Sequence, residues 1–358
     1  MELSNIKTKR IAYLDMARGI GMVLVVLGHI EYLGAGWLRY VTAFHMPLFF
    51  LVSGILICKK KEEEKPFAGL IKKKLVSIMV PYVIFSLLSF LIESSRIWVK
   101  GLDEWNVVLR QLFQSCCLQG VSTLWFLPAL FMGEVIFIGI RKKTPLWGTV
   151  ICVCVIVMGA VVINDYEQNF ARIHAVSRAY RLLHDVCSMF IRNLFCVGFL
   201  AAGYFAEIIF FEKKLKGFAD VCLALVFGMI AFVSIQMSGL VDLRSMRFAS
   251  APLYVVVAVT GSMTVIFLCK CLTRLPYNPL QQIMEYYGRN SLVIMVTHMD
   301  FRVMYIAIRL LLLLTIEPIY SILFCLVIVA IVFVLEIPII WAVNKYFPFA
   351  VGRSSKSS

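Results

Sequence analysis

The chain has 358 residues, of which 61% are hydrophobic and 16% are charged, whereas a soluble domain carries about 25% charged residues. Together with a mean hydropathy of +0.87, this excludes an ordinary soluble protein and predicts a polytopic protein of the lipid bilayer. The formal net charge of +14 does not indicate a nucleic-acid partner, because the basic residues lie in short segments between apolar runs, as topology determinants do.

The first apolar segment, 12–33, carries Arg18 and His29 eleven positions apart. Eleven residues make about three helical turns, so the two side chains share one helix face and lie roughly 16 Å apart along the axis. Asp15, three residues before Arg18, is placed to pair with it. A cation and an imidazole are costly in lipid, so their presence in a spanning segment indicates function. No small-residue cleavage site follows, and the segment is predicted to remain as a helix.

Ten apolar stretches are long enough to cross a membrane, given about 20 residues per crossing. The predicted fold is therefore all-α, with about ten transmembrane helices at 12–33, 41–58, 75–93, 123–140, 146–163, 190–211, 217–236, 251–272, 290–314 and 318–343. The second stretch is short, and Pro47 is expected to kink or open it. The polar loop before it, 34–40, is short enough to bring His45 beside His29, at similar depth on an antiparallel neighbour.

Basic residues mark alternate connections between these stretches, among them the lysine-rich run 59–74 and the cluster 141–143. The positive-inside rule then predicts cytoplasmic N- and C-termini and a multi-pass protein of the cytoplasmic membrane. The spans form one transmembrane domain, 1–345, followed by a short cytoplasmic tail, 346–358. This tail is expected to be disordered after Pro348.

Two connections on the other side are long. Residues 94–122 carry an amphipathic pattern that predicts an interfacial or re-entrant piece, and 164–189 is predicted to be a solvated outer loop with His174 and His184. The eleven cysteines lie mostly inside apolar runs and form no CxxC pair, so free thiols and no metal site are expected.

Several motifs follow one another along the chain. The most specific are Arg18-x10-His29, preceded by Tyr13-Leu14-Asp15, and the stretch FHMPLFFLVSG at 44–54. Weaker ones are Pro81-Tyr82, LWFLP at 124–128, GRNSL at 288–292 and His298. In this order, from residue 10 to about 300, the motifs resemble those of the acyltransferase 3 family of integral membrane O-acyltransferases.

The resemblance implies a ten-helix enzyme that takes an acyl group from cytosolic acyl-CoA and passes it to a carbohydrate hydroxyl at or beyond the outer face. Acetyl-CoA is the default donor. Some relatives carry an additional extracytoplasmic hydrolase-like domain. This chain ends at residue 358 without one, so its membrane domain is expected to act alone or with a partner.

The residues suit that chemistry. Acyl transfer from a thioester to a hydroxyl needs a general base or a nucleophile that carries the acyl group, and an imidazole can do either near neutral pH. The basic rim can receive CoA phosphates, and an extended pantetheine arm of roughly 15–20 Å would reach from Arg18 to His29. The predicted site comprises catalytic His29 and His45, donor-binding Arg10, Asp15, Arg18 and Arg289, and acceptor-binding Glu31, Trp125, His298 and Arg302.

Other interpretations stay open at this stage. Arg18 also suits an anchor that snorkels to the interface, His29 a helix–helix hydrogen bond, and Trp125 an aromatic-belt residue. The chain as a whole also suits a transporter of a small anionic or sugar-like solute, although no inverted repeat is visible, or a sensor subunit without turnover. The acceptor, the acyl chain length and the oligomeric state are not specified by the sequence.

Overall fold

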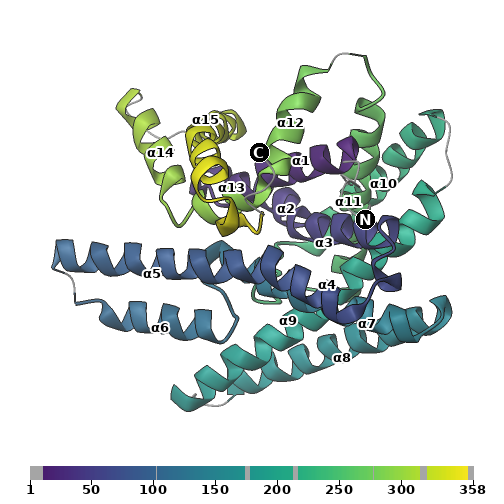
Figure 1. The fold of residues 1–358 in the computed structure, drawn as a ribbon, viewed down its shortest axis with the longest axis horizontal. Coiled ribbons are helices and arrows are strands. Elements are labelled where there is room, and N and C mark those ends of the chain that lie inside the picture. The colour runs from purple at the N-terminus through teal and green to yellow at the C-terminus, as the bar shows by residue number, and fades with distance from the viewer. Residues whose placement is uncertain are drawn as a thin grey trace, which may run out of the picture.

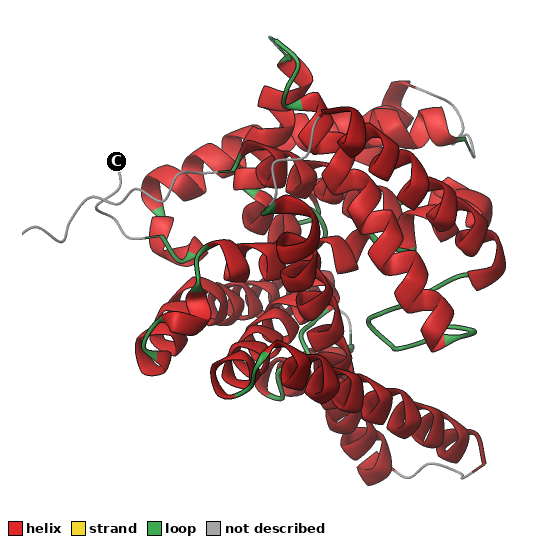
Figure 2. Cartoon of the chain, turned by 90° about the vertical axis from the view of Figure 1, so that its right-hand side faces the viewer, coloured by secondary structure: helices red, strands yellow, loops and turns green. Residues whose placement is uncertain are grey.

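The computed structural model describes residues 11–101, 103–173, 178–212, 217–276, 278–314 and 321–353, with side chains omitted at 170–173, 178–183 and 314. Within these ranges the chain is helical and has no β-sheet (Figure 1, Figure 2). The helices are α1 (Ala12–Gly28), α2 (Gly34–Thr42), α3 (His45–Lys59), α4 (Phe67–Lys74), α5 (Val80–Lys100), α6 (Trp105–Cys116), α7 (Phe126–Lys143), α8 (Leu146–Ile173), α9 (Arg178–Ala206), α10 (Gly217–Ser238), α11 (Ala251–Leu272), α12 (Pro279–Arg289), α13 (Ser291–Thr297), α14 (Val303–Leu314) and α15 (Ile322–Tyr346).

The described part of the chain contains eight helical segments that are long and apolar enough to cross a membrane. They are Glu31–Lys59, Phe67–Lys100, Ser122–Lys143, Leu146–Asn169, His184–Phe211, Gly217–Ser238, Ala251–Leu272 and Ile322–Tyr346. Their outward faces expose apolar side chains such as Val155 and Leu225, as expected toward lipid. The all-α polytopic fold is thereby confirmed. Of the two remaining predicted spans, α1 has 17 residues, and 290–314 is broken into α13 and α14.

Two predictions about connections were wrong. The predicted polar loop 34–40 is helical and forms most of α2. The predicted outer loop 164–189 is largely helical as well, because α8 continues to Ile173 and α9 begins at Arg178. In both places the polar residues sit on helix ends that extend beyond the apolar stretch. A polar composition therefore does not end a helix at either place.

The stretch 41–58 is opened near Pro47, as predicted, because α2 ends at Thr42 and α3 begins at His45. Pro47 thus lies in the first turn of α3, where its missing N–H leaves no bond unmade. The prediction of a disordered tail was wrong for the described residues 349–353. Residues 348–351 form a short helical turn whose Ala350 and Val351 are buried, and Arg353 donates to the Arg289 carbonyl oxygen at 2.8 Å.

Helix α1 lies at the centre of the bundle, where it packs against α3, α11, α12, α13 and α15. Its crossing with α12 is close enough to require glycine on both sides. A Cβ added at Gly288 would lie 1.7 Å from the Asp15 carbonyl oxygen, and one added at Gly19 would lie 2.1 Å from the Met284 carbonyl oxygen. Small residues permit such backbone contact between membrane helices.

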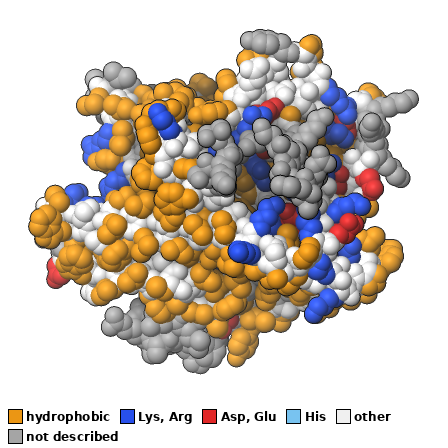
Figure 3. Space-filling model, viewed as in Figure 1, with side chains coloured by type: hydrophobic (Ala, Val, Ile, Leu, Met, Phe, Trp, Pro, Cys, Tyr) orange, Lys and Arg blue, Asp and Glu red, His pale blue; other side chains and the backbone are white. Residues whose placement is uncertain are grey.

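One end of the bundle, which we call the basic end, holds a layer of ion pairs. In Figure 3 most of the charged side chains on this face gather on the right, and hydrophobic side chains cover the centre and left. The N–O pairs are Lys59–Glu207 at 2.5 Å, Lys74–Glu62 at 2.7 Å, Lys74–Glu134 at 2.9 Å and Lys270–Asp220 at 3.0 Å. Several lysines of the predicted inner rim therefore neutralise buried carboxylates of this chain.

We expect Gly288→Ala to push α12 away from α1 and to lower the melting temperature of the purified protein by about 3 °C or more, because such overpacking costs about 2–3 kcal/mol. Gly159→Ala is the matched control, since a Cβ added at Gly159, also in a helix, meets nothing within 4 Å. Equal melting temperatures for the two variants would contradict the close crossing.

Candidate active site

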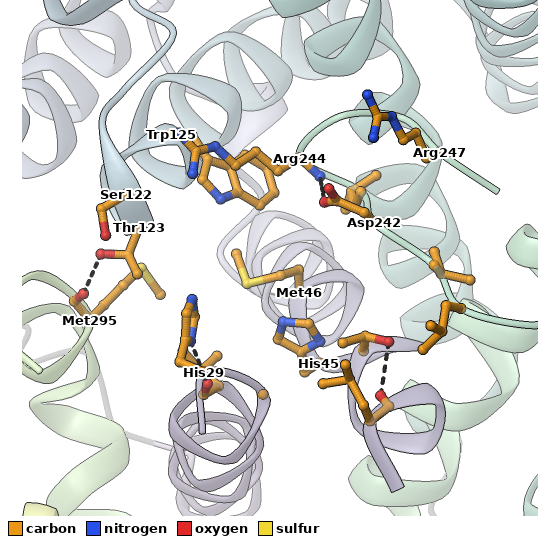
Figure 4. Close-up of a pocket in the computed structure, with 17 residues that line it drawn as sticks. His29, His45, Met46, Ser122, Thr123, Trp125, Asp242, Arg244, Arg247 and Met295 are labelled. Carbon is orange, nitrogen blue, oxygen red and sulfur yellow. Dashed lines mark hydrogen bonds between the residues drawn. The ribbon is translucent and has the colours of Figure 1, made fainter. Parts of the chain in front are cut away.

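A cavity of about 530 Å³ lies at the end of the bundle opposite to the basic end (Figure 4). Its walls come from the last turn of α1, the first turn of α3, the turn at Ser122–Trp125 and the α10–α11 connection, 239–250. His29 and His45 both line it, and Figure 4 shows their rings pointing into the same space from two helices. The structure thus brings together the two residues predicted to be catalytic.

Backbone carbonyls orient both rings. His29 Nδ1 lies 2.7 Å from the Val25 carbonyl oxygen, and His45 Nδ1 lies 3.0 Å from the Val41 carbonyl oxygen. A carbonyl can only accept a hydrogen bond, so in the neutral ring Nδ1 carries the proton and Nε2 keeps a lone pair. Each imidazole therefore presents a proton acceptor, as a general base requires.

His298 lies behind His29 and does not line the cavity. The two ring centroids are 5.2 Å apart in an edge-to-face arrangement, and the His298 side chain is fully buried. Its Nδ1 lies 2.7 Å from the Ile294 carbonyl oxygen. From this position the His298 ring packs against the His29 ring, and its role in acceptor binding stays a prediction.

A second cavity, of about 590 Å³, also borders His29. The predicted acceptor-binding residues Glu31 and Arg302 line it, together with Asp300 and Arg309. Arg302 adopts a left-handed backbone conformation, φ 58°, at the turn that separates α13 from α14. This turn opens the wall of the cavity, and His29 stands between the two spaces.

Trp125 is buried, with 6% of its surface exposed. This excludes the aromatic-belt interpretation, because a belt residue faces the membrane interface. The Arg192 guanidinium, itself 4% exposed, lies 4.9 Å from the centroid of the Trp125 ring, and the indole forms part of the cavity wall. Thr123 fastens the same turn to α13 by donating to the Met295 carbonyl oxygen at 2.7 Å.

The α10–α11 connection, 239–250, supplies residues that the sequence did not single out. Asp242, Arg244 and Arg247 line the cavity, and Figure 4 shows Asp242 and Arg244 across it from the two histidines. Partial burial lowers the pKa of Arg244, whereas Asp242 and Asp300 raise it. With an ordinary value above 12, arginine keeps its charge at neutral pH.

At the basic end, Asp15 is held by two cations. The Arg18 guanidinium lies 3.8 Å from one carboxylate oxygen and Arg289 Nε lies 3.3 Å from the other; Arg289 also pairs with Glu285. Asp15 and Arg289 therefore join α1 to α12. Arg18 has only the longer contact and is 27% exposed. Arg10, the remaining predicted donor ligand, lies outside the described residues.

Lys60 adds a cation close to Arg18. Burial lowers the pKa of the Lys60 ammonium; Glu62 opposes this, and the nearby charges of Lys73, Arg18 and Lys74 lower it further. A cation surrounded by cations is stabilised when an anion binds. This group, which the sequence placed in a lysine-rich run without distinguishing its members, is suited to a phosphate.

A family described as "Acyltransferase domain" matches residues 11–337, which include α1, α3, both cavities and the Asp15–Arg289 pair. The chain belongs to the acyltransferase 3 family. No curated protein and no solved structure shows a significant match to it. Family membership makes this chain a membrane acyltransferase and favours that activity over the transporter alternative.

The other predicted polar residues of this acyltransferase lie away from the two cavities. His184 Nδ1 lies 2.9 Å from Glu167 Oε2 in the α8–α9 hairpin, and His174 falls outside the described residues. Asn290, of the GRNSL motif, is the cap residue that precedes α13. Among the residues that the structure describes, no group of three His, Cys, Asp or Glu side chains is arranged to hold a metal ion.

We expect Arg192→Ala to loosen the connection 239–250. Arg192 donates to the Arg244 carbonyl oxygen at 3.2 Å and covers Trp125. Losing a buried charged hydrogen bond should therefore speed amide hydrogen exchange in 239–250 about tenfold or more. Arg110→Ala, which removes an exposed arginine 3.9 Å from Asp185, is the control. Equal exchange in both variants would contradict this anchoring role.

Proposed function

We propose that this membrane acyltransferase transfers an acetyl or other short acyl group from cytosolic acyl-CoA to a carbohydrate hydroxyl on the opposite side of the cytoplasmic membrane. The observation that carries the proposal is the placement of α1. Arg18, in the second turn of this helix, lies beside the cations of the basic end, and His29, its C-terminal cap residue, lies at two cavities of the opposite end.

In the proposed reaction, Nε2 of neutral His29 takes the proton of the acceptor hydroxyl as its oxygen bonds to the thioester carbonyl carbon. The tetrahedral intermediate then collapses, the carbon–sulfur bond breaks, and the CoA thiolate leaves and takes the proton from the imidazolium. The Nδ1–H bond to Val25 keeps the ring in the tautomer that accepts this proton. His45 holds the acceptor in this proposal. Its Nε2 accepts a hydrogen bond from a second hydroxyl group, while the reacting hydroxyl gives its proton to His29.

A direct transfer to the acceptor and an acyl-His29 intermediate both fit the same site. In the second case Nε2 itself attacks the thioester, and the acceptor hydroxyl later displaces the imidazole. The edge contact with His298 limits rotation of the ring in either case. The acceptor enters from one of the two cavities, each of a size that holds a small ligand.

On the donor side, Arg18 and Lys60 are proposed to bind the phosphates of CoA. Both are partly exposed, and neither is committed to a short ion pair with another described residue, unlike Lys59 and Lys74. Asp15 and Arg289 then act by holding α1 against α12. This contact fixes the position of Arg18 relative to the phosphates of CoA.

We expect His29→Ala to lower acyl-CoA-dependent acylation of envelope glycan by about 10²–10⁴-fold, the usual contribution of a general base. Acylation is measured as radiolabel moved from acetyl-CoA into glycan by membranes that contain the variant. His184→Ala, which changes a histidine outside both cavities, should retain wild-type transfer. Near-wild-type transfer by His29→Ala at equal protein abundance would overturn the catalytic role.

Arg18→Ala and Lys60→Ala should each raise KM for acetyl-CoA roughly fivefold or more, since each removes a charged contact to phosphate. Lys61→Ala is the matched control, because Lys61 is exposed and pairs with Glu64 at 3.4 Å. The readout is the CoA thiol released during transfer. An unchanged KM in both variants, with His29→Ala inactive, would place the donor elsewhere.

A further inference from the structure

The connection 239–250 is a rigid element built on neighbouring helices. Asp242 and Arg247 exchange two backbone hydrogen bonds of 2.9 Å, and the Asp242 carboxylate accepts from the backbone N–H of Arg244 at 2.9 Å. Asn164 and Gln168 of α8 donate to the Met246 carbonyl oxygen at 3.2 and 3.0 Å. The buried side chains Val241, Leu243 and Met246 anchor it below.

This element presents two guanidinium groups, those of Arg244 and Arg247, at the cavity. Within the described ranges, neither Arg244 nor Arg247 makes a side-chain hydrogen bond or ion pair, whereas their backbones are bonded. Asp242 is the one acidic residue among those lining this cavity, and the backbone and hydroxyl groups of its own turn occupy its oxygens. The space above His29 and His45 is therefore positively charged on one side.

Arg244 and Arg247 are exposed and extend from a backbone that is held in place. Such a pair can recognise an oxyanion, because the planar guanidinium matches phosphate and carboxylate geometry. The pair lies at the end of the bundle opposite to Lys60 and Arg18, since α10 and α11 run from this connection to the Asp220–Lys270 pair of the basic end. The donor phosphates proposed for the basic end therefore do not account for it. An anion bound by this pair would therefore belong to the molecule that enters the cavity at His29.

We propose that the acceptor is an anionic saccharide, and that Arg244 and Arg247 hold its phosphate or carboxylate while a hydroxyl of the same saccharide reaches His29. This inference rests on the proposed function and names the substrate class of the same site. Trp125 forms another wall of the cavity, against which an apolar sugar face can pack. Arg192 secures both the tryptophan and the arginine-bearing connection.

The test uses the purified full-length protein in lipid nanodiscs, radiolabelled acetyl-CoA and glycan isolated from cells that lack the protein. In one arm the glycan is untreated, in the second its carboxylates are amidated, and in the third its phosphates are removed with aqueous hydrogen fluoride. We expect one treatment to lower transfer about tenfold or more, since a charged contact is lost, and the effective treatment identifies the anion.

Variants connect the effect to the two arginines. The double variant Arg244→Ala/Arg247→Ala should raise KM for untreated glycan about tenfold or more, and Arg244→Lys/Arg247→Lys should recover part of it by keeping the charge. Arg110→Ala should match wild type.

Equal transfer to untreated and to both neutralised glycans would overturn the inference and leave the proposed function standing. Absence of transfer to any glycan would overturn the proposed function and the inference with it.

Discussion

Polar groups on an apolar helix are the constraint on which the rest of this structure depends. Helix α1 is long enough to reach deep into a membrane, yet it carries Asp15, Arg18 and His29, which cannot face lipid without a large cost in free energy. The helix is therefore enclosed by α3, α11, α12, α13 and α15. The other helices, with their exposed apolar faces, surround this inner group.

Enclosure gives the two ends of α1 different surroundings. At the basic end, glycine contacts let α12 approach closely enough for Arg289 to reach Asp15. At the other end, α1 finishes where α2, α3 and the α10–α11 connection diverge, and the space between them becomes a cavity beside His29. One short helix thus links the basic end to the cavity at His29, and the proposed transfer across the membrane depends on this link.

The features that the sequence predicted are those that depend on local spacing. The Arg18–His29 interval, the nearness of His45 and the apolar spans follow from helix geometry and from short connections. Features that depend on contacts between distant segments were missed. Nothing near Arg244 in the sequence indicates that Arg192 of α9 donates to its carbonyl oxygen or that α8 holds the neighbouring Met246. The sequence shows Arg244 only as part of a polar, charged connection between two apolar stretches.

Charge patterns were informative about topology and less so about ligands. Lys59 and Lys74 belong to the lysine-rich run that predicted a phosphate site. The structure pairs both with buried carboxylates of this chain instead: Lys59 with Glu207, and Lys74 with Glu62 and Glu134. Lys60, between them, is a better candidate because its neighbours are mostly cations. Likewise, His298 follows the last residue of α13, and its ring packs edge to face against His29, a contact that the sequence did not predict.

The central claim is that the acyl group crosses the membrane domain from donor to acceptor. It is tested most directly in proteoliposomes that contain the purified protein, with radiolabelled acetyl-CoA outside and the impermeant acceptor glycan sealed inside. The account predicts labelled glycan in the lumen of intact vesicles, and none when donor and acceptor are both kept outside vesicles whose protein has its basic end outward. Label that forms only when the two substrates share one side would contradict it.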